Sequence, residues 1–452
     1  MWMGIDLGTQ SVRAVLAADD GEILGSGSAP LTGRREGPLH EQLPADWWTA
    51  VTAAVRGALR GGHRPRALAV CSTSGTVLLT DDRGRALTPA VMYDDGRAPG
   101  RGLGRARLLL DAHGPGHITH QADLITARLA GRRLPTDSSH ALKTGYDPER
   151  EAFDDPGQPG LPEVVRPGVR IGEVSREAEA ATGLAAGTAI VAGMTDGCAA
   201  QIASGSLAVG SWNSVLGTTL VLKGVTAEPL RDPAGVVYSH RSPDGGWLPG
   251  GASNVGGGAL RAAFPDADPA ALDALARAHE PAGAIAYPLG ARGERFPFRA
   301  PDATAFLLGT PVSDADHWAA LLQGVALTER LCLDYLDFLG APVDGPLAFT
   351  GGAVRSDYWT RLRAEILGRP VRIPVSGEPA LGMAVLAAYG AGAAPALAGV
   401  AERMVRLSRT VRPAGSQRFT GPYLTLVGEL ERRGWLPPEV ASHAYTRTER
   451  QR

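Results

Sequence analysis

The chain is poor in lysine and cysteine. Among its 45 basic residues only Lys143 and Lys223 are lysines, and neither follows a glycine. The Gly-Lys-Ser/Thr sequence of a Walker A phosphate loop is therefore missing. The three cysteines, Cys71, Cys198 and Cys332, are far apart and odd in number, which predicts neither a metal site nor a disulfide framework. Any nucleotide chemistry must use a different phosphate cradle.

Other absences limit the partners and the location that we expect. The formal net charge is −2, and no basic stripe alternates with aromatic residues, which argues against a nucleic-acid partner. No run of about 18 apolar residues and no basic segment followed by an apolar one occurs. We therefore expect no membrane partner and a cytoplasmic location. The sequence does not indicate whether the chain forms oligomers.

What the sequence does contain is material for more than one hydrophobic core. It has 452 residues, of which 44% are hydrophobic and 20% are charged, and this length favours two or more domains. Strand-like and helix-like segments alternate from the start, which predicts an α/β fold. We place the two domains at residues 1–208 and 209–440. Residues 446–452 are expected to form a frayed tail.

The segment Gly4–Ser11 predicts a strand, a tight turn and the start of a second strand. We expect Asp6 and Thr9 to lie at the turn. Glycine lets backbone N–H groups approach a phosphate closely, and successive N–H groups form an anion-binding concavity. A carboxylate such as Asp6 can hold Mg²⁺ directly or through water. An ordinary glycine-containing hairpin also explains these residues.

The same plan returns in the second half of the chain. A strand over 211–216 is followed by Gly217-Thr218-Thr219 and a strand over 220–223. This internal echo predicts two similar lobes that face each other across a cleft, with a nucleotide held between opposed turns. Between the two hairpins, a strand over 189–193 leads to Asp196 at the start of a helix.

Four segments in this order resemble the FGGY carbohydrate kinases, within the actin-like, ribonuclease H-like ATPases. They are GIDLGTQSVRAVL and SWNSVLGTTLVL for the two phosphate motifs, AGMTDGCAAQ for the catalytic Asp, and FTGGAVRSDYW with EPALGMAVLAA for adenosine. The resemblance implies an α/β protein with two actin-like domains facing across a cleft. It also implies a sugar kinase that uses ATP and Mg²⁺ and takes a small-molecule sugar.

Within the family, four stretches are most like the D-ribulose kinase branch of plants and cyanobacteria: STSGTVLLTDDRGRALTPAVMYDDGRA, THQADLITARLAG, TDSSHALKTGYD and GMTDGCAAQIASGSLAVGSWNSVLGTTLVLKGVT. This likeness predicts phosphorylation of the terminal hydroxyl of a ketopentose, D-ribulose, to D-ribulose 5-phosphate. The alternatives are a xylulokinase or another FGGY polyol or sugar kinase, and a non-kinase actin-like ATPase. The chain departs from many relatives at Met92 or Tyr93, where they have Trp, and at Ser356, where they have Asn.

Asp196 is the candidate general base, because an ordinary aspartate is ionised at neutral pH and can accept a hydroxyl proton. The alternative is a helix N-cap. Asp6 is predicted to bind Mg²⁺. Asp6 and Thr9 are also predicted to be catalytic residues. The nucleotide site is predicted to contain Gly8, Thr9, Gln10, Ser11, Gly217, Thr218, Thr219, Gly351, Gly352, Ser356 and Trp359. The sugar site is predicted to contain Ser72, Asp95, Arg97 and Asp196.

Two of these assignments have structural alternatives. Asp95 and Arg97 could form a surface salt bridge that contributes little. Trp359 could be a half-buried aromatic residue of a helix. His120 is expected to be structural, since the histidines show no ligand spacing.

Overall fold

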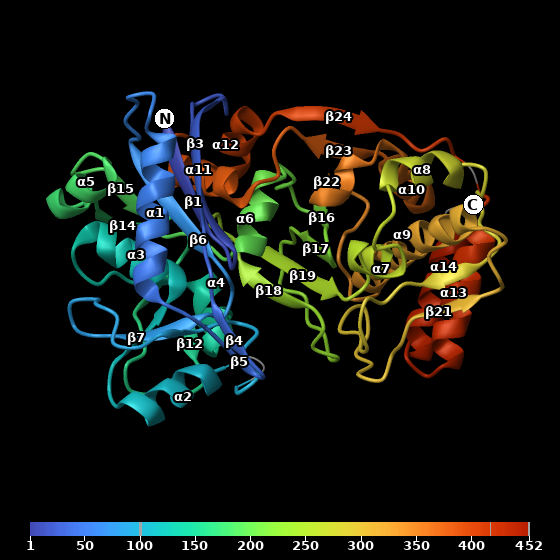
Figure 1. Cartoon of the computed structure of the whole chain (residues 1–452), viewed down its shortest axis with the longest axis horizontal. Helices are drawn as coiled ribbons and strands as arrows, with labels where there is room; N and C mark the ends of the chain where they lie inside the picture. Colours follow the sequence, from blue (N-terminus) through green and yellow to red (C-terminus); the bar gives the residue numbers. More distant parts are fainter. Residues whose placement is uncertain (99–101, 416, 451–452) are drawn as a thin grey trace. The chain divides into compact units, whose positions relative to one another are not determined.

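The computed structural model describes residues 1–98, 102–415 and 417–450, which divide into two compact units (Figure 1). Unit 1 contains Met1–Gly205, His240–Gly246 and Ser376–Arg406, and unit 2 contains Ser206–Ser239, Trp247–Val375 and Leu407–Arg452. The chain first passes from unit 1 to unit 2 between Gly205 and Ser206, close to the domain boundary expected after residue 208. The segment 376–406, which we had expected in the second domain, packs with unit 1 instead.

Unit 1 is built from a six-stranded sheet, a five-stranded sheet and two two-stranded sheets, with helices around them. Its elements are β1 (Trp2–Leu7), β2 (Ser11–Ala17), β3 (Ile23–Pro30), β4 (Arg34–Glu36), β5 (Leu39–Gln42), α1 (Pro44–Ala58), β6 (Ala67–Ser72), β7 (Val77–Thr80), β8 (Ala90–Val91), α2 (Gly104–His113), β9 (His117–His120), α3 (Gln121–Ala130), β10 (Thr136–Asp137), α4 (Ser138–Ala141), η1 (Leu142–Thr144), β11 (Tyr146–Asp147), β12 (Ala152–Phe153), β13 (Val164–Val165), β14 (Arg170–Glu173), α5 (Arg176–Thr182), β15 (Ala189–Val191), α6 (Asp196–Ala203), α11 (Pro379–Gly390) and α12 (Leu397–Met404).

Unit 2 has one large sheet with helices packed around it. Its elements are β16 (Trp212–Leu216), β17 (Leu220–Gly224), β18 (Tyr238–Arg241, of which Tyr238 and Ser239 belong to this unit), β19 (Trp247–Ser253), α7 (Gly257–Ala263), α8 (Pro269–Ala276), β20 (Ile285–Tyr287), β21 (Phe306–Leu308), α9 (Asp314–Phe338), β22 (Leu347–Thr350), η2 (Gly352–Arg355), α10 (Asp357–Leu367), β23 (Val371–Pro374), β24 (Leu407–Val411), α13 (Thr420–Arg432) and α14 (Pro438–Arg450).

The two large sheets repeat one topology. The first sheet has the strand order β14-β15-β6-β1-β2-β3. The second, seven-stranded sheet has the order β24-β23-β22-β16-β17-β19-β18, and its first six strands occupy the same sequence of positions. In each sheet the central hairpin, β1-β2 or β16-β17, is antiparallel. The first strand of each hairpin also pairs in parallel with a later strand, β1 with β6 and β16 with β22. The outer pairs match in direction as well. The duplication expected from the two hairpins is therefore present at the level of strand order and direction.

Strand β1 is packed on both faces. Because side chains alternate along a strand, Met3, Ile5 and Leu7 share one hydrophobic cluster with Trp47 of α1. The intervening Gly4 faces α11, where a Cβ atom would lie 1.7 Å from the carbonyl oxygen of Ala380. Helix α11 can approach β1 this closely only because residue 4 has no side chain. The side chain of Asp6 leaves the strand on the same face as Gly4.

The core of unit 2 forms around α9, whose buried residues run along most of its length. Within this core, Arg363 of α10 donates two hydrogen bonds to Glu329 of α9, at 2.8 and 2.9 Å, and one to Ser214 of β16 at 2.8 Å. Both charged side chains are fully buried. The pair joins two helices to the central strand of the sheet.

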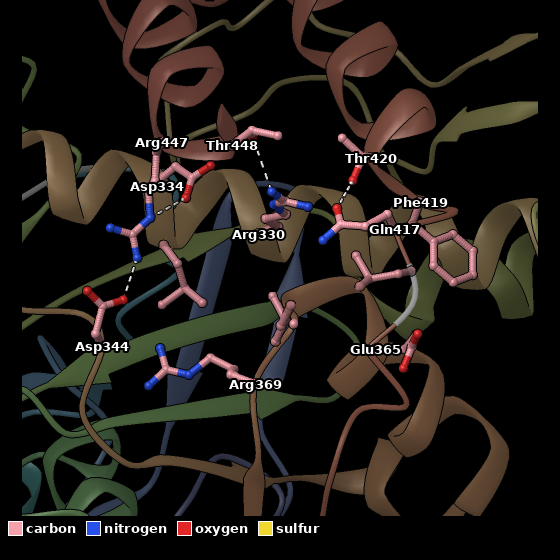
Figure 2. A pocket seen from close by; sticks show the side chains of 15 residues that line it. Arg330, Asp334, Asp344, Glu365, Arg369, Gln417, Phe419, Thr420, Arg447 and Thr448 are labelled. Atoms are coloured by element: carbon pink, nitrogen blue, oxygen red, sulfur yellow. Dashed lines mark hydrogen bonds and ion pairs between the residues drawn. The ribbon is translucent and has the colours of Figure 1, made fainter. Parts of the chain in front are cut away.

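The C-terminal segment is not a frayed tail up to residue 450. Helix α14 continues to Arg450, and residues 451 and 452 lie outside the described residues. Arg447 forms ion pairs with Asp334 at 3.0 Å, Asp337 at 2.8 Å and Asp344 at 2.6 Å. Figure 2 shows Arg447 and its neighbour Thr448 beside a polar cavity of about 410 Å³. These contacts hold the end of the chain against α9.

Candidate active site

Asp6 lies within β1, one residue before the strand ends, rather than in the turn itself. It is opposite Arg13 of β2 and beside Cys71 of β6. The Cys71 thiol donates a hydrogen bond of 3.5 Å to the Asp6 carboxylate. The strand pairing therefore fixes the direction of this carboxylate from both sides.

The turn that follows Asp6 is held by hydrogen bonds from two directions. Within the turn, the N–H of Gly8 donates to the carbonyl of Ser11 at 3.0 Å. From outside, the Gln42 amide donates to the carbonyl of Thr9 at 2.7 Å, and Gln42 is itself held by Trp47 at 2.7 Å. The predicted residue Gln10 is exposed, and Ser11 opens β2. The predicted hairpin is confirmed.

Asp196 is the first residue of α6 and is half-buried. The N-cap position belongs to Thr195, so the alternative interpretation of Asp196 as the helix N-cap is wrong. Its carboxylate accepts a hydrogen bond of 2.7 Å from the N–H of Gly197. A carboxylate at the start of a helix is also favoured by the helix dipole.

Asp6 and Asp196 interact with each other in unit 1. Burial raises the pKa of Asp6, and the negative charge of Asp196 raises it further, to about 7. The thiol of Cys71 and the charge of Arg13 act in the opposite direction but do not outweigh these effects. The guanidinium of Arg13 is itself engaged with Glu378. Because the two carboxylates repel each other's negative charge, a bound cation would stabilise the ionised form of both.

Residues Asp137, Ser139 and His140, which we call the α4 bracket, hold the backbone next to Asp196. The Ser139 hydroxyl accepts a hydrogen bond of 2.7 Å from the N–H of Thr195. Asp137 caps α4 by accepting from the N–H groups of Ser139 and His140, both at 2.9 Å. The bracket therefore positions Asp196 through its neighbour. Sequence reasoning missed it, because nothing in the pattern TDSSHA relates α4 to α6.

Ser72 is buried and contacts the α4 bracket through His140. It is 0% exposed, accepts a hydrogen bond of 3.1 Å from the N–H of Ala122, and lies 2.9 Å from Nε2 of His140. Nδ1 of His140 in turn lies 2.6 Å from Asp137. Because Ser72 has no exposed surface, its predicted contact with the sugar is not supported by this structure.

The bracket predicts a pH dependence of stability. Burial alone would lower the pKa of His140, but the charge and hydrogen bond of Asp137, with the charges of Asp123 and Asp196, raise it to about 8. The stabilisation is complete below the unfolded-state pKa of about 6.5 and is lost as the pH rises through 8. We expect it to amount to about 2 kcal/mol.

Urea unfolding of the native chain and of the His140→Gln variant between pH 6 and pH 9 measures this effect. The native protein should lose unfolding free energy across this range, and the variant should lose less, by the amount that His140 contributes. Parallel curves for the two proteins would contradict the prediction.

Asp95 and Arg97 form a salt bridge in which the carboxylate is buried and the arginine is exposed. Asp95 is 1% exposed and accepts hydrogen bonds from the N–H of His40 at 2.8 Å and from the N–H of Arg97 at 2.9 Å. The Arg97 guanidinium bonds Asp95 at 2.8 Å and Glu41 at 2.7 Å. Burial would raise the pKa of Asp95, but these bonds and the charge of Arg97 lower it. The pair fixes the loop that displays the half-exposed Tyr93.

The second predicted phosphate turn, residues 217–219, joins β16 to β17 in unit 2. The carbonyls of Gly217 and Thr218 accept hydrogen bonds of 2.9 and 3.0 Å from the N–H groups of Gly257 and Gly258. Thr218 also accepts a bond of 2.8 Å from Arg261. The glycine run 256–258 was not singled out from the sequence, although three consecutive glycines are a signal for close backbone approach.

Gly351 lies at the same edge of the sheet as Gly217, because β16 and β22 are parallel and both end there. Its φ is +86°, and a Cβ atom would lie 2.6 Å from the carbonyl oxygen of Leu216. This position therefore requires glycine. Gly352 begins η2 and is exposed.

The two residues predicted to lie near adenine have structural roles in unit 2. Ser356 is the N-cap of α10: its hydroxyl accepts from the N–H of Trp359 at 2.9 Å and donates to Asp273 at 2.5 Å. Trp359 is 6% exposed, and its indole N–H donates to the carbonyl of Leu322 at 3.1 Å. The alternative of a structural aromatic residue accounts for Trp359.

The residues near Asp6 fit a magnesium ion better than a metal that needs a full protein cage. Among the described residues, no group of three or more His, Cys, Asp or Glu side chains is placed to hold a metal. Mg²⁺ is commonly bound through one or two carboxylates, with water and phosphate oxygens completing its shell. The mutually repelling carboxylates of Asp6 and Asp196 match that donor set.

Comparisons with known proteins agree with this arrangement. The profile of the N-terminal domain of the FGGY family of carbohydrate kinases matches residues 1–101, and that of its C-terminal domain matches residues 212–391. The xylulose kinase of Streptomyces rubiginosus is 28% identical over 430 residues, covering 85% of this chain and 87% of that protein. The xylulose kinase of Escherichia coli K12 is 26% identical over 440 residues, covering 86% and 90%.

Solved structures show the same fold. The crystal structure of xylulose kinase from Rhodospirillum rubrum matches with a TM-score of 0.84 at 26% identity and covers 96% of this chain and 99% of that one. Gluconate kinase from Lactobacillus acidophilus matches with a TM-score of 0.86 at 18% identity, covering 95% and 97%. At that identity the second match speaks for the fold alone.

The repeated sheet topology and these matches define an α/β protein with two actin-like, ribonuclease H-like ATPase domains. The chain belongs to the FGGY family of carbohydrate kinases, whose two domain profiles together match more than half of it. It is a phosphotransferase with an alcohol group as acceptor. The relatives named above are xylulose kinases, so the more specific likeness to a D-ribulose branch is not confirmed. No helix among the described residues is both long and apolar enough to cross a membrane.

Proposed function

We propose that the chain is an ATP-dependent ketopentose kinase that phosphorylates the terminal hydroxyl of its sugar. The observation that carries this proposal is the pairing of two carboxylates in unit 1. Asp6 lies one residue before the end of β1, beside the phosphate-type turn, and Asp196 begins a helix close enough to influence the pKa of Asp6. A kinase needs these two functions, a cation-binding acid and a base, in one place.

Asp196 is the proposed general base. It accepts the proton of the sugar hydroxyl as that oxygen forms its bond to the γ-phosphorus, and the bond from the γ-phosphorus to ADP breaks. The α4 bracket supports this role, because the bond from Thr195 to Ser139 limits movement of the residue before the base. Asp6 would hold Mg²⁺, which supplies positive charge for the phosphate oxygens.

The proposed nucleotide contacts divide between the two units. In unit 1 they are Gly8, Thr9, Gln10 and Ser11, and in unit 2 they are Gly217, Thr218, Thr219, Gly351 and Gly352. Exposure of Gly217, Thr218 and Gly351 at one sheet edge supports this assignment. Ser356 and Trp359 would act indirectly. Ser356 caps the N-terminus of α10 and Trp359 packs this helix against the core, which positions the sheet edge that carries Gly351.

For the sugar, we propose that Asp95 and Arg97 act by shaping the loop that carries Tyr93. The Tyr93 side chain is 44% exposed, and its hydroxyl interacts with Thr9 and with the charge of Asp196. This combination supports Tyr93 as one wall of the sugar site. Sequence reasoning noted Tyr93 only as a departure from the Trp of many relatives.

We propose D-xylulose as the preferred ketopentose, on the names of the relatives that match over most of the chain. D-ribulose is the second candidate, favoured by the sequence stretches quoted above. Pocket geometry separates the two sugars, which differ in the orientation of one hydroxyl, and discrimination through hydroxyl contacts can be large.

The test is a comparison of kcat/KM for D-xylulose, D-ribulose and glycerol, measured by ADP release at saturating ATP and Mg²⁺. We expect D-xylulose to be favoured by at least about tenfold. A larger value for D-ribulose would move the assignment to the second candidate. ATP hydrolysis that no ketopentose stimulates would reject the ketopentose proposal altogether.

A further inference from the structure

A cavity of about 260 Å³ in unit 2 is lined by an unusual concentration of arginine. We call it the arginine pocket, and its charged and polar wall includes Arg277, Arg361, Arg412, Arg418, Glu280 and Tyr358. These residues come from the end of α8, from α10 and from the segment after β24. None of the residues proposed to contact ATP lines it.

The carboxylates of the pocket are already engaged. Glu280 forms an ion pair of 2.6 Å with Arg418. Glu365, which also lines the cavity, accepts a hydrogen bond from the backbone N–H of Ala414. Four guanidinium groups therefore face two carboxylates, and neither carboxylate is shared with Arg361 or Arg412.

Arg361 and Arg412 are the groups that an incoming anion would meet. Both are exposed, and within the described part of the chain neither forms an ion pair or a hydrogen bond. Arg409 and Arg432, two other exposed arginines of unit 2, are by contrast paired with acids. Two unpaired guanidinium groups on one cavity produce a local positive potential that favours a multiply charged anion.

The pocket also offers a buried hydroxyl. Tyr358 is 4% exposed, its ring lies 5.3 Å from the guanidinium carbon of Arg277, and its hydroxyl faces Glu280 without a well-formed hydrogen bond. Because the bond to Glu280 is not well formed, the hydroxyl can turn to donate to a ligand oxygen instead. The planar guanidinium fork suits the oxygens of a phosphate group in particular.

We propose that the arginine pocket binds a small phosphate monoester, at a site separate from the ATP contacts. The volume admits a phosphate group with a short organic portion, and the chemistry of the wall recognises the dianion. Inorganic phosphate shares that chemistry, so the test must separate the two sources. Helix α10 carries both Tyr358 and the Ser356 cap, so the pocket is built on the same helix as the proposed adenosine edge.

Isothermal titration calorimetry of the full chain at fixed ionic strength tests the proposal, with glycerol 3-phosphate and inorganic phosphate as separate probes. The double variant Arg361→Gln, Arg412→Gln should weaken binding of glycerol 3-phosphate by at least about tenfold, because it removes two charge-assisted contacts. Arg372→Gln is the matched control, since Arg372 is an exposed arginine of unit 2 outside the pocket. It should leave the affinity unchanged.

Each outcome of the titration decides the matter. Tighter binding of glycerol 3-phosphate than of inorganic phosphate supports a monoester site. Equal affinities would assign the pocket to inorganic phosphate and overturn the proposal, as would equal losses in the pocket and control variants. Displacement by ATP would make the pocket part of the nucleotide site, again overturning it. Kinase activity without added phosphate ester should be unchanged in the double variant, which confirms that the variant is folded.

Discussion

The Asp196→Asn variant should lose about 10²- to 10⁴-fold in kcat, the range that a general base contributes. Asparagine keeps the size of the side chain and its acceptor oxygen, so the bond from the N–H of Gly197 survives. What it loses is the ability to take up a proton from the sugar hydroxyl. KM for the sugar and for ATP should change far less than kcat, because the loss falls on the transition state.

Asp46→Asn is the matched control for this prediction. Asp46 also lies in the first turn of a unit 1 helix, α1, and is exposed. Removing its charge repeats the helix-dipole effect of the Asp196 variant, which is about 0.3–1 kcal/mol at an exposed site, without touching the proposed base. Steady-state kinetics and thermal unfolding of both variants separate the two effects. An Asp196→Asn enzyme with near-native kcat would remove Asp196 from the chemistry.

The Gly4→Ala variant should lower the unfolding free energy by about 3 kcal/mol or more, at the upper end of overpacking effects. The new methyl group would meet the carbonyl oxygen of Ala380 at 1.7 Å and the backbone nitrogen of Ala384 at 2.5 Å. Both are backbone atoms of α11, which cannot move aside by a change of rotamer. Relief requires α11 to shift away from β1, and Gly382 already holds that helix tightly against Ala199 of α6.

Gly399→Ala is the control for this steric argument. Gly399 lies in α12, in the same unit, and an added Cβ atom would meet nothing within 4 Å. Alanine should be neutral or stabilising there, by up to about 1 kcal/mol, because it restricts the unfolded chain. Chemical denaturation of the two variants gives the comparison. Equal stabilities would show that α11 is not packed against β1 as the structure has it.

The elements that could be predicted are those whose residue pattern is local, such as an apolar run bounded by turn residues. The sequence predicts strands over 77–80 and 347–350, because each is a short apolar run ended by turn residues, and the structure has both with these bounds. Pro44-Ala45-Asp46 predicts the start of a helix that runs to about residue 60, and α1 begins at Pro44 and ends at Ala58. The two hairpins lie where glycine and threonine interrupt apolar runs. The C-terminal tail was predicted wrongly, because the pairing of Arg447 with three aspartates is invisible in the local sequence.

The sequence by itself determined the α/β class, the duplicated hairpins and, through four ordered motifs, the family and its phosphotransfer chemistry. Those properties depend on residue types at short spacing. Only the tertiary structure decided that Ser72 is buried behind His140, that Asp95 and Arg97 brace a loop, and that 376–406 packs with unit 1. These depend on which side chains meet across distant segments, as when Ser139 holds the residue before Asp196. Periodicity and composition carry no record of such contacts.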